Sequence, residues 1–331
     1  MGVRVGMDVS VVLSLLLGLA LLIGGGEVLV RGAVGLAERL GVSPLLIGLT
    51  VVALGTSAPE LAVSVQAALS GAGGIAIGNI VGSNIANILL ILGLSALVFP
   101  VAVASRALLR DGVVMVAVSA GYTALAWLWG LDRIVGVAVL LAAVAYFWAT
   151  IAGERRAAAD HGAVFDKAAA FEEVDPGRLH RLSGLAKPVA FFAIGLLVIV
   201  FGGRLLVEGA VGLAQGFGVP EEVVGLTIVA VGTSLPELVT SLIAAIRRHA
   251  DVALGNVIGS NILNILVIGG VTSAIAPVAA APQLLWFDMP VMVGVSLLLL
   301  LFGRSGWRIG RREGAAMLAL YGAYLWALAA V

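Results

Sequence analysis

The sequence contains no cysteine, three histidines and few charges. Without cysteine, disulfides, thiolate metal sites and a cysteine nucleophile are excluded. The histidines are scattered, which leaves little material for a zinc or haem site. Only 11% of the 331 residues are charged, and 19 basic residues balance 19 acidic ones. A polybasic surface for nucleic acid is therefore not expected.

Common catalytic patterns are also missing. The sequence has no Gly-x-Ser-x-Gly, no His-Glu-x-x-His and no Walker loop. Hydrolysis and ATP-driven transport are therefore not expected, and we predict that the protein is not an enzyme. No cofactor is expected either.

Apolar residues, by contrast, are in large excess. They make up 61% of the chain, and its mean hydropathy is +1.14. Soluble domains are about 45–50% apolar and about 25% charged, so lipid must cover part of this surface. Ten stretches are long enough for membrane-spanning helices, which need about 20 residues each, and continuous apolar runs favour helices over a barrel. They are 9–30, 43–69, 75–99, 108–129, 134–152, 187–209, 220–246, 252–276, 284–303 and 311–330.

An internal repeat relates the two halves of the chain. Shifted by 177 residues, Gly55-Thr-Ser-Ala-Pro-Glu60 matches Gly232-Thr-Ser-Leu-Pro-Glu237, and Gly78-Asn-Ile-Val-Gly-Ser-Asn-Ile-Ala-Asn87 matches Gly255-Asn-Val-Ile-Gly-Ser-Asn-Ile-Leu-Asn264. Five predicted spans per half is an odd number, so the halves would enter the membrane from opposite sides. We therefore predict an all-α integral membrane protein of ten transmembrane helices in two inverted five-helix repeats, a common transporter plan.

The predicted organisation has three parts. Residues 1–152 form the first repeat, with its motifs in 43–99, and residues 188–331 form the second, with its motifs in 220–276. Between them, residues 153–187 hold 12 of the 38 charges and are expected to be a cytoplasmic linker.

The basic residues predict an orientation. Sixteen of the 19 Lys and Arg residues fall on one side of the predicted spans, which should be the cytoplasmic side. Both termini are then outside. The Ala-, Gly- and Arg-rich composition and the short linker favour a prokaryotic plasma membrane.

Two acidic residues occupy equivalent places near the centres of apolar spans. Glu60 and Glu237 have no Lys or Arg within about two helical turns in sequence. A charge at this depth costs about 2.5–3.5 kcal/mol on insertion scales, so each carboxylate needs compensation. A bound cation or a proton is the simplest source, while permanently protonated structural glutamates are the alternative.

The residue before each glutamate is proline. Pro59 and Pro236 cannot donate to the carbonyls four residues earlier, so each helix should unwind there and free main-chain oxygens. Hydroxyls lie beside this point, on Thr56, Ser57, Thr233 and Ser234. Carboxylates, carbonyls and hydroxyls suit hard ions such as Ca²⁺, Na⁺ or Mg²⁺. A proline kink with hydroxyls bonded back to the helix is the alternative.

The next predicted helix of each half adds polar residues. Ser83 and Asn87, like Ser260 and Asn264, are four residues apart and share one helical face. They are further candidate ligands, while interhelical packing is the alternative. The neighbouring Asn79, Asn84, Asn256 and Asn261 are weaker candidates.

The doubled motif resembles the two repeats of the sodium/calcium exchanger family, within the cation/Ca²⁺ exchanger superfamily. The resemblance covers residues 25–111 and 202–288 and implies a Na⁺/Ca²⁺ antiporter, commonly with three Na⁺ per Ca²⁺. It implies that Ca²⁺ is held by the carboxylates of Glu60 and Glu237 and the carbonyls of Thr56 and Thr233. For Na⁺ it implies the same glutamates with further ligands on Ser57, Ser234, Ser83, Ser260, Asn87 and the carbonyls of Ala53 and Ala230.

The residue at position 264 bears on whether K⁺ is co-transported. Family members that co-transport K⁺ place Asp at this position, so the resemblance favours K⁺-independent exchange. It leaves Asn264 as a candidate ligand without a charge.

Several readings stay open. The same fold could exchange another divalent cation or use H⁺ as the counter-ion, and a cation channel or an intramembrane acid/base enzyme belongs to a different class. The expected partners are Ca²⁺, Na⁺ and the lipid bilayer. A monomer should suffice for transport, and protein partners are not predictable.

Overall fold

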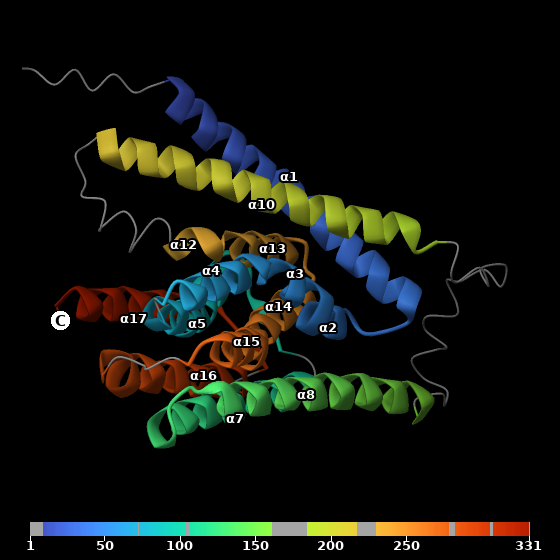
Figure 1. Ribbon diagram of the computed structural model, residues 1–331. Helices are drawn as coiled ribbons and strands as arrows, with labels where there is room; N and C mark the ends of the chain where they lie inside the picture. Colours follow the sequence, from blue (N-terminus) through green and yellow to red (C-terminus); the bar gives the residue numbers. More distant parts are fainter. Residues whose placement is uncertain are drawn as a thin grey trace, which may run out of the picture.

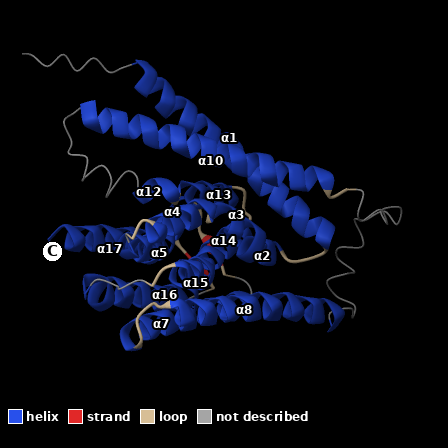
Figure 2. Ribbon diagram, viewed as in Figure 1, coloured by secondary structure: helices blue, strands red, loops and turns tan. Residues whose placement is uncertain are grey.

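The computed structural model describes residues 9–71, 73–103, 106–160, 184–216, 230–277, 282–304 and 307–330. Almost all of them are helical (Figure 2). The predicted linker falls largely on 161–183, and the predicted span 220–246 begins within 217–229. Both of these segments lie outside the described residues.

The described part of the chain consists of helices of very different lengths and two short strands. They are α1 (Val9–Leu40), α2 (Pro44–Ile47), η1 (Gly48–Val52), α3 (Ala53–Thr56), α4 (Ala58–Leu69), α5 (Gly73–Ala86), η2 (Asn87–Leu92), α6 (Gly93–Val98), β1 (Val101–Ala102), α7 (Arg106–Leu128), α8 (Arg133–Asp160), α10 (Ala186–Gly216), α12 (Ala230–Thr233), α13 (Leu235–Ile246), α14 (Ala250–Leu263), η4 (Asn264–Gly269), α15 (Gly270–Ile275), η5 (Leu284–Asp288), α16 (Met289–Arg304), β2 (Arg308–Ile309) and α17 (Arg311–Ala330).

The longest helices, α1 and α10, cross each other on one side of the molecule (Figure 1). Glycines let their backbones approach closely: a Cβ added at Gly32 would lie 2.3 Å from the backbone nitrogen of Phe192, and one at Gly195 would lie 2.4 Å from that of Leu29. Such small-residue contacts are typical of helix pairs in membranes. The first helix continues to Leu40, ten residues beyond the predicted end of its apolar stretch.

The motif-bearing helices form the centre of the molecule. α4, α5, α13 and α14 lie between the α1–α10 pair and the α7–α8 pair (Figure 1). In the span that begins with α14, 94% of the apolar window is buried inside the protein, whereas in α1 only 22% of the corresponding window is buried. Leucines such as Leu13 and Leu16 are more than half exposed. An apolar surface of this kind faces lipid, so the protein is an all-α membrane protein.

A short β-ladder joins distant parts of the chain and was not predicted. Val101–Ala102 pairs antiparallel with Arg308–Ile309, and the amide of Val103 donates to the carbonyl of Trp307 over 2.7 Å. Two residues per strand are too few to produce an alternating pattern, so the sequence gives no signal for it.

Among the described residues, seven helices are long and apolar enough to cross a membrane, and the bent pair Pro44–Thr56 and Ala58–Leu69 would make an eighth. α13, at 12 residues, is shorter. α17 has 20 residues but begins with three charges and is not among the seven. The predicted number of ten therefore stays a prediction.

Candidate ion-binding site

The helix that carries Glu60 is broken where the sequence predicts it. α3 ends at Thr56, α4 begins at Ala58, and the two segments meet at a bend of 46°. Pro59 stands at the start of α4, where the missing amide hydrogen does no harm. The second half repeats this arrangement, because α12 ends at Thr233 and α13 begins at Leu235. Each glutamate thus lies in the first turn of a new helix, where the helix dipole stabilises a negative charge.

Both glutamates are buried and are held by the opposite half of the chain. Ser57 Oγ donates to Glu237 Oε1 over 2.8 Å, and Ser234 Oγ donates to Glu60 Oε1 over 3.0 Å. Each carboxylate is only 1% exposed. Because each serine precedes the glutamate of its own half by three residues, the two bonds are related by the 177-residue shift. Glu60 and Glu237 therefore belong to one cluster.

Among the residues that the structure describes, the second oxygen of each carboxylate has no donor. Glu60 Oε2 and Glu237 Oε2 are buried without a hydrogen-bond partner, and so are Asn87 Oδ1 and Asn264 Oδ1. The other described side-chain atoms of this kind are hydroxyl oxygens, which can turn toward a partner. An unpaired buried carboxylate oxygen is costly unless a cation or proton satisfies it.

The asparagines at the ends of α5 and α14 face the opposite half through their nitrogens. Asn87 Nδ2 donates to Asn261 Oδ1 over 3.0 Å, and Asn264 Nδ2 donates to Asn84 Oδ1 over 3.2 Å. These bonds leave the oxygens of Asn87 and Asn264 without a donor. A π-helical turn begins at each of these two asparagines. Such turns are frequent at functional sites.

The serines of these helices are buried too. Ser260 Oγ lies 3.0 Å from the Ser57 hydroxyl, beside Glu237, so it belongs to the cluster. Ser83 is 6% exposed on α5. Thr56 Oγ1 lies 3.1 Å from the Val52 carbonyl and 3.1 Å from Asn256 Oδ1. Back-bonding to the helix is therefore present at Thr56.

The four residues whose carbonyls are candidate ligands differ in hydrogen bonding, in burial and in their place along the helices. Ala53 O accepts the Ser57 amide over 3.0 Å, so this oxygen keeps a helical partner. Thr233 is half-buried, whereas Thr56 is fully buried. Ala230 begins α12.

The weaker asparagine candidates hold the site together. Asn79 Nδ2 donates to Ser64 Oγ over 2.9 Å and to the Glu60 carbonyl over 3.2 Å. Asn256 makes the equivalent bonds to Ser241 Oγ, over 2.9 Å, and to the Glu237 carbonyl, over 3.4 Å. These residues clamp α5 to α4 and α14 to α13.

Further contacts join the two halves, through two methionines and two serines that were not predicted. Asn84 Nδ2 lies 3.5 Å from Met292 Sδ, and Asn261 Nδ2 lies 3.6 Å from Met115 Sδ. Ser119 Oγ and Ser296 Oγ, which are 177 positions apart, lie 3.4 Å from each other. Their matching positions in the two halves were the only signal available.

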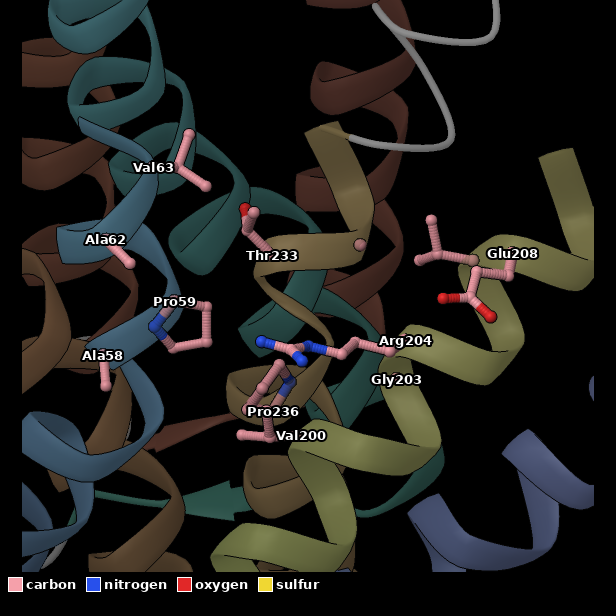
Figure 3. A pocket seen from close by; sticks show the side chains of 12 residues that line it. Ala58, Pro59, Ala62, Val63, Val200, Gly203, Arg204, Glu208, Thr233 and Pro236 are labelled. Atoms are coloured by element: carbon pink, nitrogen blue, oxygen red, sulfur yellow. The ribbon is translucent and has the colours of Figure 1, made fainter. Parts of the chain in front are cut away.

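A cavity of about 490 Å³ lies beside the broken helices (Figure 3). Pro59 and Ala62 of α4, Gly203 and Arg204 of α10, and Pro236 of α13 are among the residues that line it. Arg204 extends toward Pro236 (Figure 3). The cavity therefore reaches residues adjacent to both glutamates in sequence.

The charge of the site is low. Within the described ranges, no group of three or more His, Cys, Asp or Glu side chains could hold a metal ion. A tight resident-metal centre normally has more charged ligands. Glu60 and Glu237 are therefore the two charged oxygen donors of a cluster whose other oxygens are neutral.

Comparison with known proteins identifies the family. The family model described as "Sodium/calcium exchanger protein" matches residues 10–152 and 187–330. The chain belongs to the sodium/calcium exchanger family. Its relatives include the sodium/calcium exchanger MaX1 of Methanosarcina acetivorans, 38% identical over 95% of this chain and 97% of that one, and the inner membrane protein YrbG of Escherichia coli, 37% identical over 91% and 90%.

Solved structures agree. The sodium-calcium exchanger NCX_Mj, soaked with zero Na⁺ and Ca²⁺, superimposes with a TM-score of 0.82 at 35% identity, covering 97% of this chain and 99% of that one. The predicted family, and with it a membrane antiporter for Na⁺ and Ca²⁺, is confirmed. The exchanger is a transporter and not an enzyme.

Proposed function

We propose that the exchanger binds Na⁺ and Ca²⁺ in turn at one shared site between Glu60 and Glu237, and that it works by alternating access. One observation carries the proposal: each half of the chain contributes a buried carboxylate with one oxygen bonded by the other half and one oxygen unpaired. These two free oxygens are the proposed ligands of the ion.

The remaining ligands are proposed from the same cluster. For Ca²⁺ they are the carbonyls of Thr56 and Thr233. The free amide oxygens of Asn87 and Asn264 support a place for both residues in the site. Bound Na⁺ ions would draw on the glutamates together with Ser57, Ser234, Ser83, Ser260, Asn87, Asn264 and the carbonyls of Ala53 and Ala230.

Charge balance explains why exchange is obligatory. Two carboxylates neutralise one Ca²⁺ or two Na⁺, so ions of the two kinds compete for the same oxygens. An occupied site is nearly neutral and can change its access. An empty site carries two buried negative charges, and moving it through a low-dielectric region is costly. Uncoupled return of the empty carrier is therefore slow.

The two-fold reciprocity of the hydrogen bonds supports the inverted repeat. Bonds from Ser57, Asn79, Asn84 and Asn87 each have a counterpart 177 residues later. We propose ten transmembrane helices in two inverted halves, residues 1–152 and 188–331, joined by a linker at 153–187. We further propose a prokaryotic plasma membrane as the location, with both termini outside, and transport by the monomer.

The movement that alternates access is assigned to α1 and α10. They pack mainly on each other, through close glycine contacts, on one side of the central helices (Figure 1). The cavity between α10 and α4 is the proposed path to the ions in this conformation. A sliding α1–α10 pair would close this path and open the equivalent one between α1 and α13.

The neutral side chain of Asn264 supports K⁺-independent exchange. It bonds to Asn84 through its nitrogen, as Asn87 does to Asn261, so both halves use the same uncharged group. Flux should be unaffected when K⁺ is replaced by choline.

Flux in proteoliposomes tests the proposal. ⁴⁵Ca²⁺ uptake should require Na⁺ inside the vesicles and should stop when Na⁺ is equal on both sides. Uptake driven by a pH gradient without Na⁺ would indicate proton coupling. Uptake that needs no counter-ion, together with unitary currents of the size typical of channels, would refute the antiport mechanism.

A further inference from the structure

Two faces that the repeat makes equivalent are packed differently. On one face α1 lies against α13: a Cβ added at Gly26 would lie 2.7 Å from Val239 Cγ1. On the other face the equivalent residues, Gly203 of α10 and Ala62 of α4, line the cavity instead (Figure 3). A Cβ at Gly203 would come no closer than 3.9 Å to another atom. The α1–α13 face is thus closed and the α10–α4 face is open.

An ion pair bridges the closed face. Glu27 Oε2 accepts from Arg247 Nε over 2.7 Å. Arg247 directly follows the last residue of α13, so this contact ties the middle of α1 to the end of α13. The other oxygen of Glu27 accepts from Arg31 Nε, also over 2.7 Å, but Arg31 lies on α1 itself and moves with Glu27. Of the two ion pairs of Glu27, only the one with Arg247 depends on the position of α1 relative to α13.

The open face cannot form the equivalent ion pair. The 177-residue shift places Arg204 at the position of Glu27, Glu208 at that of Arg31, and Ser70 at that of Arg247. The order of charges along the helix is reversed, and the residue at the end of α4 is neutral. No charged residue occurs between Glu60 and Arg106, so α5 and α6 offer Arg204 no acid either.

We propose that the Glu27–Arg247 ion pair is a latch that biases the exchanger toward the access state with the α1–α13 face closed. The proposal rests on the alternating access proposed above. When α1 and α10 slide, the α1–α13 face opens and the latch breaks. The face that closes instead brings Arg204 toward Ser70, and among the described residues the end of α4 and helices α5 and α6 supply no acid to replace the lost ion pair.

The size of the bias follows from the exposure of the latch. The Glu27 side chain is 23% exposed and that of Arg247 is 53% exposed, so solvent screens the pair. Exposed ion pairs change an equilibrium constant by about 1.4-fold to fivefold. Loss of the latch should therefore raise the population of the opposite state by about 1.4-fold to fivefold.

Thiol labelling measures this population, because the protein has no cysteine of its own. Ala62→Cys places a thiol in the open cavity, and Val239→Cys places one at the equivalent position of the closed face. In lipid nanodiscs, where a membrane-impermeant methanethiosulfonate reaches both faces, A62C should react faster than V239C. The ratio of the V239C rate to the A62C rate then reports the balance of the two states.

Four variants test the latch against this ratio. Glu27→Gln and Arg247→Ser should each raise it about 1.4-fold to fivefold. Arg31→Gln is the matched control: it removes a bond of equal length to the same carboxylate, but within α1, and should leave the ratio unchanged. Ser70→Glu gives Arg204 a partner on the opposite face and should raise the ratio without removing any ion pair.

The outcomes separate the latch from the proposed function. A wild-type ratio in both E27Q and R247S, or an equal rise in R31Q, would overturn the latch. A wild-type ratio in S70E would overturn the role of the missing partner of Arg204. If Ca²⁺ flux through the unmodified protein did not depend on Na⁺, the proposed exchange at the shared site would be overturned instead. This flux is measured independently of thiol labelling.

Discussion

Replacing one of the two glutamates by glutamine is the sharpest perturbation of the site. In Glu60→Gln the amide oxygen can still accept the Ser234 hydroxyl, which now lies 3.0 Å from Glu60 Oε1. The change removes one negative charge and almost no volume. The fold should therefore be kept, while a Ca²⁺ ion in the site would carry one uncompensated positive charge.

The expected loss of affinity is large because the carboxylate is buried. Glu60 is 1% exposed, so solvent cannot replace the lost charge. Removing one partner of a buried ion pair costs about 3–5 kcal/mol. At about 1.4 kcal/mol per tenfold, this corresponds to a Kd for Ca²⁺ that is higher by about 150-fold to 4,000-fold. Glu237→Gln should behave alike, since its carboxylate has the equivalent environment.

Two measurements are needed. Isothermal titration calorimetry with the purified protein gives the Kd for Ca²⁺, and a thermal melt without Ca²⁺ checks folding. Glu38→Gln is the control, because it removes an acidic residue from an exposed position on α1. Binding within tenfold of wild type in both E60Q and E237Q, with normal melts, would show that the two carboxylates are not ligands of Ca²⁺.

Further substitutions test single contacts. Ser57→Ala removes a donor to Glu237 and should weaken Ca²⁺ binding by about 1–3 kcal/mol, measured by calorimetry; unchanged binding would contradict this role. Asn264→Asp adds a charge and should change the preference among Na⁺, K⁺ and Ca²⁺ in flux assays, whereas unchanged selectivity would place it outside the site. Gly259→Ala would bring a Cβ within 2.6 Å of the Leu49 carbonyl and should lower the Tm, while Gly82→Ala, with no atom within 4 Å, should not; equal Tm values would argue against this packing.

Much of the central structure was predictable from local chemistry. The break at Ser57 follows from Pro59, since a proline inside a continuous helix would remove a hydrogen bond, whereas the first turn of a new helix tolerates it. The burial of Glu60 and Glu237 follows from apolar neighbours. The repeat then implied that the two halves meet, and the bonds from Ser57 and Ser234 across the halves agree with this.

Other features were not predictable because they depend on packing between distant segments. Asn84 and Asn261 were only weaker candidates, yet they accept the hydrogen bonds of Asn264 and Asn87. Helical periodicity fixes the face of a residue but not the helix that it meets. The latch was missed for the same reason: Glu27 and Arg247 are 220 positions apart, and nothing in their local sequence links them.

Diffraction from crystals soaked in Sr²⁺, as a heavier substitute for Ca²⁺, shows directly whether both glutamates hold the ion. We expect an anomalous peak within coordination distance of both Glu60 Oε2 and Glu237 Oε2, and its disappearance when Na⁺ is raised at constant Sr²⁺. A peak that contacts only one of the two carboxylates, or one that persists unchanged in saturating Na⁺, would rule out a shared site between them.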